Sequence, residues 1–108
     1  MKLLLDESIP VRLAGHFPTE FSVSTVAGLR WAGTKNGALL ARTTSEGFHA
    51  FITADKGIEH QQNLDTLKIL IVVLVARSNR LQELAPLVPQ VIQLLRQKPI
   101  PRVYRVPA

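Results

Sequence analysis

The sequence predicts an α/β fold, a doubly wound and mainly parallel sheet of four or five strands flanked by helices. Three short apolar runs, at 3–5, 48–53 and 69–75, are too short for helices and are typical of strands buried on both faces. Segments with a helical spacing of apolar residues precede the second run, at 36–46, and follow the third, at 81–97. This alternation indicates a parallel sheet, and 108 residues suit a single domain.

The composition excludes several classes of protein. Although 46% of the residues are hydrophobic, no run approaches the roughly 18 consecutive apolar residues of a membrane span. Lys2 is followed by only three leucines, which is not the layout of a signal peptide. The lack of cysteine excludes disulfides and thiolate metal sites, and we expect a cytoplasmic protein. The formal charge of +5 suits an anionic partner such as nucleic acid or an acidic protein segment.

The first half of the chain predicts two strands and two helices. The opening apolar run is the first strand, and Ser8 is predicted to cap a helix over about 10–16. Residues 21–26 alternate between apolar and polar, which predicts a second strand with one wetter face. A second helix is predicted over 36–46, with Gly47 as its C-terminal stop.

The middle of the chain predicts the third and fourth strands. Residues 48–53 form the third strand, and the β-branched run at 69–75 is the strongest strand signal in the chain. A short polar helix or turn is expected between them, over 58–63. The simplest doubly wound order places the first strand between the second and the third.

The C-terminal part predicts one amphipathic helix and an edge strand. Residues 81–97 repeat apolar side chains at helical spacing. Pro86 and Pro89 lie within this segment, so the helix is expected to start late or to kink. Residues 103–106 are expected to form a short edge strand that Pro107 cannot extend.

Carboxylates follow two of the predicted strands. Asp6 and Glu7 come directly after the first strand, and Asp55 follows the third, with Lys56 beside it. If those strands are neighbours, Asp6 and Asp55 lie on adjacent strand ends, roughly 5 Å apart in the pairing direction. Two carboxylates that close are stabilised by a cation or a shared proton. Oxygen ligands favour Mg²⁺ or Mn²⁺, ions that commonly serve phosphodiester hydrolysis.

Each acid also has a purely structural interpretation. An aspartate just after a strand is often a helix cap or a turn residue, and Asp55 precedes a polar turn. As a pair on two buried strands, however, the aspartates favour a functional site. The three histidines have no ligand spacing, and Trp31 is interpreted as a lid over the core.

Further polar side chains are expected at the same edge of the sheet. Arginines, lysines and amides beside a carboxylate pair could hold phosphate groups. The polar stretch at 60–63 is expected there too. The candidate substrate-binding residues are Lys35, Asn36, Lys56, Arg77, Asn79 and Arg80.

Three stretches resemble the small stand-alone PIN-like proteins, which are compact relatives of the PIN-domain ribonucleases. They are the opening from Leu3 to Pro10, the helix start from Gly33 to Gly37, and the strand end from Phe51 to Asp55. The stretches at 61–63 and 76–80 are similar to one bacterial sub-branch of that group. The resemblance runs from Met1 to about Leu95, so residues 1–108 are interpreted as a single PIN-like domain.

This resemblance implies a parallel sheet whose carboxyl edge gathers acids that bind Mg²⁺ or Mn²⁺. It also implies single-stranded RNA as the substrate class, a role as the toxin of a toxin–antitoxin pair, and a homodimer. Asp6 matches the family's acid after the first strand and Asp55 the acid after the third, with Glu7 as a third catalytic candidate. Where such proteins commonly carry an acid at the helix start, this chain has Ala38 and no carboxylate until Glu46.

One main hypothesis and two alternatives follow. In the main hypothesis the chain is a metal-dependent endoribonuclease: Asp6 and Asp55 hold the ion, activated water attacks phosphorus, and Asn36 or Arg77 orients the substrate. The first alternative is a PIN-like module that binds an antitoxin or RNA without cleaving it, which Ala38 favours. The second is a phosphoacceptor domain of receiver type. A receiver needs its aspartate on the third strand and a lysine after the fifth, whereas here Asp55 and Lys56 are adjacent.

Overall fold

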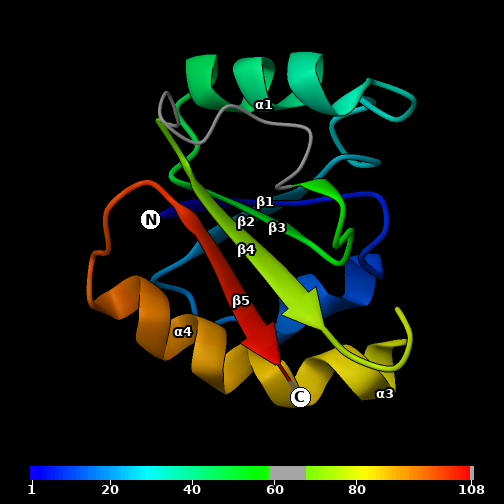
Figure 1. Cartoon of the computed structure of the whole chain (residues 1–108), viewed down its shortest axis with the longest axis vertical. Coiled ribbons are helices and arrows are strands. Elements are labelled where there is room, and N and C mark those ends of the chain that lie inside the picture. The colour runs from blue at the N-terminus through cyan, green and yellow to red at the C-terminus, as the bar shows by residue number, and fades with distance from the viewer. Residues whose placement is uncertain (59–67, 108) are drawn as a thin grey trace.

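The fold is built on a five-stranded, all-parallel sheet with the strand order β2-β1-β3-β4-β5 (Figure 1). The computed structural model describes residues 1–58 and 68–107. The prediction that the first strand lies between the second and the third is confirmed. The strands are β1 (Lys2–Leu5), β2 (Ser22–Thr25), β3 (Ala50–Thr53), β4 (Leu70–Val75) and β5 (Val103–Pro107).

Side chains of the strands alternate between two cores because the side-chain period of a strand is two. On β1, Leu3 and Leu5 pack into one core and Leu4 into the other. On β3, Ile52 and Phe51 divide in the same way. Both faces of the central strands are therefore covered, which is why these segments read as continuous apolar runs.

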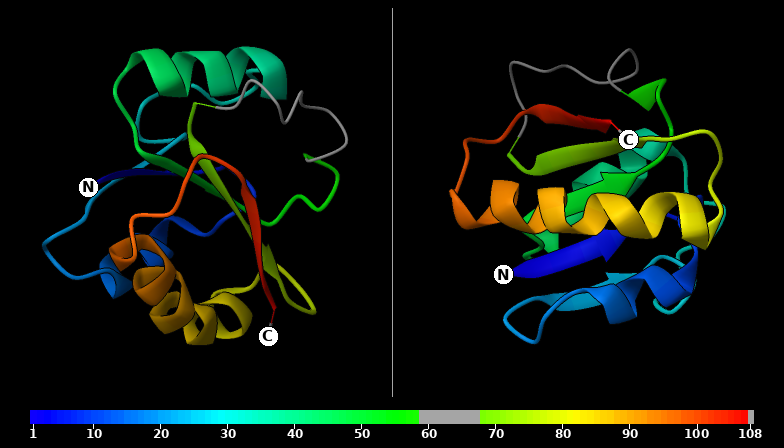
Figure 2. Two further views of the ribbon diagram at one scale, coloured as in Figure 1. Left: turned by 60° about the vertical axis from the view of Figure 1, so that its left-hand side comes forward. Right: turned by 90° about the horizontal axis from the view of Figure 1, so that it is seen from below.

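Helices cover the two faces of the sheet unequally (Figures 1 and 2). The helix α1 (Asn36–Ser45) packs on the face that carries Leu4 and Phe51. The 3-10 helix η1 (Val11–His16) and the C-terminal helical segment pack on the opposite face. In the described part of the chain, no helix is long and apolar enough to cross a lipid bilayer.

The C-terminal helical segment is interrupted by its prolines, as predicted. It consists of α3 (Leu81–Leu84), the 3-10 turn η3 (Ala85–Leu87) and α4 (Val88–Arg96). Pro86 and Pro89 each lie in the first turn of the piece that contains them, where a missing N–H costs nothing.

Two local predictions were wrong. Ser8 does not cap the first helix: η1 follows Pro10 with no side-chain cap, and the Ser8 hydroxyl bonds Asp6 instead. Pro107 was predicted to lie beyond the edge strand, but it is the last residue of β5 and pairs with Val75. An edge strand tolerates a proline because one side of its backbone faces no neighbour. The predicted polar helix over 58–63 lies, beyond Ile58, outside the described residues.

Candidate functional site at the carboxyl edge of the sheet

The parallel strands bring the predicted acids to one edge of the sheet. Leu5, the last residue of β1, pairs with Ile52 of β3. The next residue, Asp6, donates its backbone N–H to the Ile52 carbonyl at 2.9 Å, so the ladder continues for one more step. Asp6 therefore lies directly beside the end of β3, as the neighbouring-strand prediction required.

The Asp6 carboxylate is buried, with only 8% of the residue exposed. Its Oδ2 atom accepts hydrogen bonds from the Thr53 hydroxyl at 2.8 Å and the Ser8 hydroxyl at 2.9 Å. These donors offset part of the cost of taking a carboxylate out of water. Neither hydroxyl carries a charge, and no lysine or arginine of the described ranges forms an ion pair with Asp6.

Thr53 links the two aspartates. Its hydroxyl donates to Asp6 and accepts the backbone N–H of Asp55 at 3.0 Å. The Ser8 hydroxyl makes a parallel link, donating to Asp6 and accepting the Ala54 N–H at 3.3 Å. Each hydroxyl thus uses both its donor and an acceptor position. Together they join the end of β1 to the end of β3 through side chains.

Asp55 takes part in a turn as well. Its Oδ1 atom accepts the Gly57 N–H at 2.9 Å, the contact of an Asx turn, and its carbonyl accepts the Ile58 N–H at 3.3 Å. The structural interpretation of Asp55 as a turn residue is therefore correct. This turn contact involves the Oδ1 atom of the carboxylate.

The remaining candidates lie on segments that reach the same edge, and those other than Asn36 are exposed. Glu7 follows Asp6, Lys56 follows Asp55, and the loop after β4 carries three more. Lys35 precedes α1, where its carbonyl accepts the Leu39 N–H, and Asn36 is the first residue of that helix. Asn36 set aside, no hydrogen bond or ion pair within the described ranges joins these candidates to the Asp6 carboxylate. The loop residues after β4 are Arg77, Asn79 and Arg80.

Thr53 and Ser8 are the residues of this site that sequence reasoning missed. Thr53 was read only as the end of an apolar strand and Ser8 only as a helix cap. The sequence signal is a hydroxyl at the end of an apolar strand, and the pairing of Leu5 with Ile52 then places Thr53 beside Asp6. Because a fully buried hydroxyl needs a partner, this pattern points to Asp6.

The donor set is small for a metal centre. Among residues 1–58 and 68–107, no three histidine or acidic side chains come close enough to hold an ion together. Ala38, in the first turn of α1, is exposed and offers no ligand. The candidate oxygen ligands are the carboxylates of Asp6 and Asp55, and such ligands suit Mg²⁺ or Mn²⁺ better than a softer metal.

Comparison with known proteins adds no relative. No family model matches the chain. No curated protein and no solved structure matches it either. The chain is therefore classified by its fold alone, as an α/β protein with a five-stranded parallel sheet.

Proposed function

We propose that the chain is a PIN-like, metal-dependent ribonuclease that uses Asp6 and Asp55 to hold Mg²⁺ or Mn²⁺. The observation that carries the proposal is the buried Asp6 carboxylate, which has two hydroxyl donors and no cationic partner in the described ranges. Buried carboxylates without a cationic side chain commonly coordinate a metal. The carboxyl edge of an open α/β sheet is also the usual place for a ligand.

The residues of this edge divide the work of phosphodiester hydrolysis. A divalent ion, when bound, lowers the pKa of a water ligand and neutralises charge on the leaving oxygen. Thr53 and Ser8 hold the Asp6 carboxylate in one orientation through hydrogen bonds to the same oxygen. Exposed cations on the surrounding loops, such as Lys56, Arg77 and Arg80, supply positive charge for RNA phosphates.

A Mn²⁺ titration by calorimetry tests the metal site without a guess about the substrate. We expect wild type to bind Mn²⁺ and Asp6→Asn to bind at least about tenfold more weakly, since loss of even an outer-shell partner has effects of that size. The matched control is Glu46→Gln, which removes an exposed carboxylate after the end of α1 and leaves Mn²⁺ affinity unchanged. Wild type that binds no Mn²⁺ would overturn the nuclease mechanism.

Cleavage of single-stranded RNA is then assayed with Mn²⁺ present. Asp6→Asn, purified in parallel, reveals any contaminating ribonuclease because its own activity is expected to vanish. Activity that is equal in wild type and Asp6→Asn contradicts the proposal.

A second candidate is a PIN-like module that binds RNA or an antitoxin protein without cleaving. It is supported by Ala38, which leaves the first turn of α1 without a carboxylate. It predicts RNA binding, or a complex with a small DNA-binding protein encoded by the neighbouring gene, with no cleavage at any Mn²⁺ concentration.

The strand order also supports a receiver-type phosphoacceptor. The order β2-β1-β3-β4-β5 is that of flavodoxin-like folds, and Asp55 follows β3. Against this, the fifth strand, Val103–Pro107, carries no lysine. Incubation with acetyl phosphate and Mg²⁺ separates the two: a phosphoryl group on Asp55, detected by mass, would replace the nuclease proposal.

A further inference from the structure

A hollow lies at the amino edge of the sheet, opposite the acidic site. Its volume is about 460 Å³, which is within the range of ligand-binding pockets. Its lining includes the apolar residues Phe48, Leu70, Pro99 and Pro101 and the charged side chains of Lys68 and Lys98. These residues precede or begin β3, β4 and β5, so the hollow is lined by residues at the starts of strands rather than at their ends.

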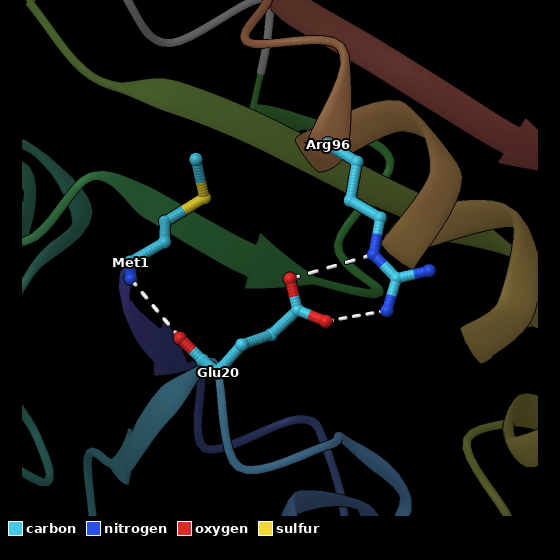
Figure 3. A network of polar contacts seen from close by, with 3 residues as sticks. All are labelled: Met1, Glu20 and Arg96. Atoms are coloured by element: carbon cyan, nitrogen blue, oxygen red, sulfur yellow. Dashed lines mark hydrogen bonds and ion pairs between the residues drawn. The ribbon is translucent and has the colours of Figure 1, made fainter.

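The two lysines are the positive charge available to a ligand in this hollow. Neither forms an ion pair with a carboxylate of the described ranges. The nearby Arg96 is already neutralised, because its guanidinium bonds the Glu20 carboxylate, while the Met1 amine donates to the Glu20 carbonyl (Figure 3). Arg96, Glu20 and Lys98 line a smaller adjoining hollow of about 240 Å³.

Lys98 occupies this place at a conformational cost. It is the residue after the C-cap of α4 and has a φ of 50°, in the left-handed region that favours glycine. The helix α1 ends in the same way, but there the residue is Gly47, with a φ of 82°. A lysine where glycine is the favoured solution is a strained position, and strained positions cluster at ligand sites.

The loop that carries Lys98 is held in place and offers an apolar group. The Tyr104 hydroxyl donates to the Ile100 carbonyl at 3.0 Å, and prolines flank Ile100 on both sides. Ile100 is 59% exposed, one of two large hydrophobic side chains exposed to this degree in the described ranges. A preformed loop reduces the entropy that binding must overcome.

The aromatic ring in the hollow is unsuited to nucleic acid. Bases bind to exposed aromatic faces, but Phe48 is buried. The Lys2 ammonium lies over its ring at 4.3 Å from the centroid, and Trp31 packs edge-on against it. Phosphate groups would pair with the lysines but would make no contact with the apolar lining residues. A peptide with a large apolar side chain next to a carboxylate would use both.

We propose that this hollow binds a segment of a partner protein in which an acidic residue lies next to a large apolar residue. The apolar side chain contacts the proline side of the hollow, at Pro99 and Pro101, and the carboxylate pairs with Lys68 or Lys98. This interface is separate from the metal site and goes beyond the proposed function. Asp6→Asn therefore keeps the peptide affinity of wild type, whether or not the nuclease proposal holds.

The probe is a fluorescein-labelled hexapeptide of alternating glutamate and leucine, followed by fluorescence anisotropy and by amide chemical shifts. We expect saturable binding that weakens with salt, with shifts concentrated at 48–49, 68–70 and 98–102. Lys68→Gln and Lys98→Gln are each expected to weaken binding about fivefold, equivalent to about 1 kcal/mol. A glutamate–serine peptide, which keeps the charge alone, is expected to bind at least about fivefold more weakly.

Lys98→Gly gives the sharpest test because it separates stability from binding. It relieves the left-handed backbone and raises the midpoint of thermal unfolding by a few degrees, yet weakens peptide binding. The matched control is Arg30→Gly, at the other non-glycine residue of the described ranges with a strongly positive φ, 62°. It lies outside the lining of the hollow, so it raises the midpoint and leaves binding unchanged.

Three results would overturn the proposal. The first is no binding of the glutamate–leucine peptide at millimolar concentration. The second is equal binding of the glutamate–serine peptide, which would make the surface a plain charge patch. The third is displacement by oligouridylate with the same shifts, which would make it a nucleic-acid surface.

Discussion

The two edges of the sheet present their candidate binding groups, a carboxylate at one and lysines at the other, by different means. At the carboxyl edge, Asp6 continues the ladder of β1, and hydroxyls from the strand ends bond its carboxylate. At the amino edge, Lys98 arrives from the end of a helix and needs a left-handed backbone. Asp6 is buried and Lys98 is exposed.

This difference follows from the connectivity of a parallel sheet. Residues just after a strand inherit the register of the ladder, so a short polar side chain there is positioned within hydrogen-bond reach of its neighbour strand. Residues just before a strand come from helix ends and loops, whose backbone is fixed turn by turn. Rigid, buried geometry for a metal therefore forms more readily at the first edge, and exposed, longer side chains for a partner at the second.

The largest loss of folding stability is expected from removing the Thr53 hydroxyl that links the two aspartates at the carboxyl edge. Thr53→Val keeps the shape but removes the donor to Asp6 and the acceptor of the Asp55 N–H. We expect the free energy of unfolding to fall by about 1–3 kcal/mol, the cost of leaving buried polar groups unpaired. Urea denaturation measures it.

The control for that variant is Thr43→Val in α1. Thr43 is as fully buried as Thr53, but its hydroxyl donates to the Leu39 carbonyl within its own helix. Its removal leaves a carbonyl that the helix ladder still serves, so the loss is expected to stay below about 1 kcal/mol. Equal costs for the two variants would show that the link at the acidic edge has no special role in stability.

Exchanging the types of the residues that follow α1 and α4, Gly47 and Lys98, is expected to change the free energy of unfolding by a smaller amount. Gly47→Lys forces a side chain into a φ of 82°, and we expect a loss of about 1 kcal/mol. Lys98→Gly does the reverse and gains up to about 1 kcal/mol. Thermal and urea unfolding of both variants measure the pair. Destabilisation by Lys98→Gly would contradict the assignment of Lys98 as a strained residue.

The smallest effect concerns the exposed ion pair at the amino edge. The hydrogen bond from the Arg96 guanidinium lowers the pKa of the Glu20 carboxyl below its ordinary value of 4.5. A lowered folded-state pKa stabilises the fold above pH 4.5, and this contribution disappears as the pH falls through the folded-state pKa.

Arg96→Gln is the test of that pH dependence. The unfolding midpoints of wild type and Arg96→Gln should differ slightly at neutral pH and converge in strong acid, as measured by circular dichroism. Because both side chains are exposed, salt should reduce the difference as well. A difference that persists in strong acid would mean that Arg96 stabilises the fold through packing rather than charge.

The sequence contained most of the sheet and half of the site. Apolar runs located β1, β3 and β4 within about two residues, because a strand buried on both faces has few alternatives. The alternation at 21–26 and the short segment at 103–106 located β2 and β5 as closely. Asp6 and Asp55 were placed at one edge by the same reasoning. The roles of Ser8 and Thr53 were not foreseen, because a hydroxyl has many partners and only the register of β1 and β3 selects one.

The hollow at the amino edge was harder still to predict from the sequence. Nothing in the sequence marks Lys98 as left-handed, since lysine is a common helix residue and the preceding segment has helical spacing. The helix ends there because Pro99 disfavours a helical backbone at Lys98. The hollow itself arises from four segments distant in sequence, so local pattern could not reveal it.

The position of β5 has a consequence for how the chain is made. All six residues of β4 are apolar and five are buried, and β5 is the strand that pairs with its outer edge. During synthesis β4 is made before residues 103–107, so its outer edge stays unpaired and prone to aggregation until β5 is available. Leu3 must also pair with Ala50, nearly half the chain away, before the sheet has a centre. Because these pairings join distant parts of the chain, slow folding is the expected result.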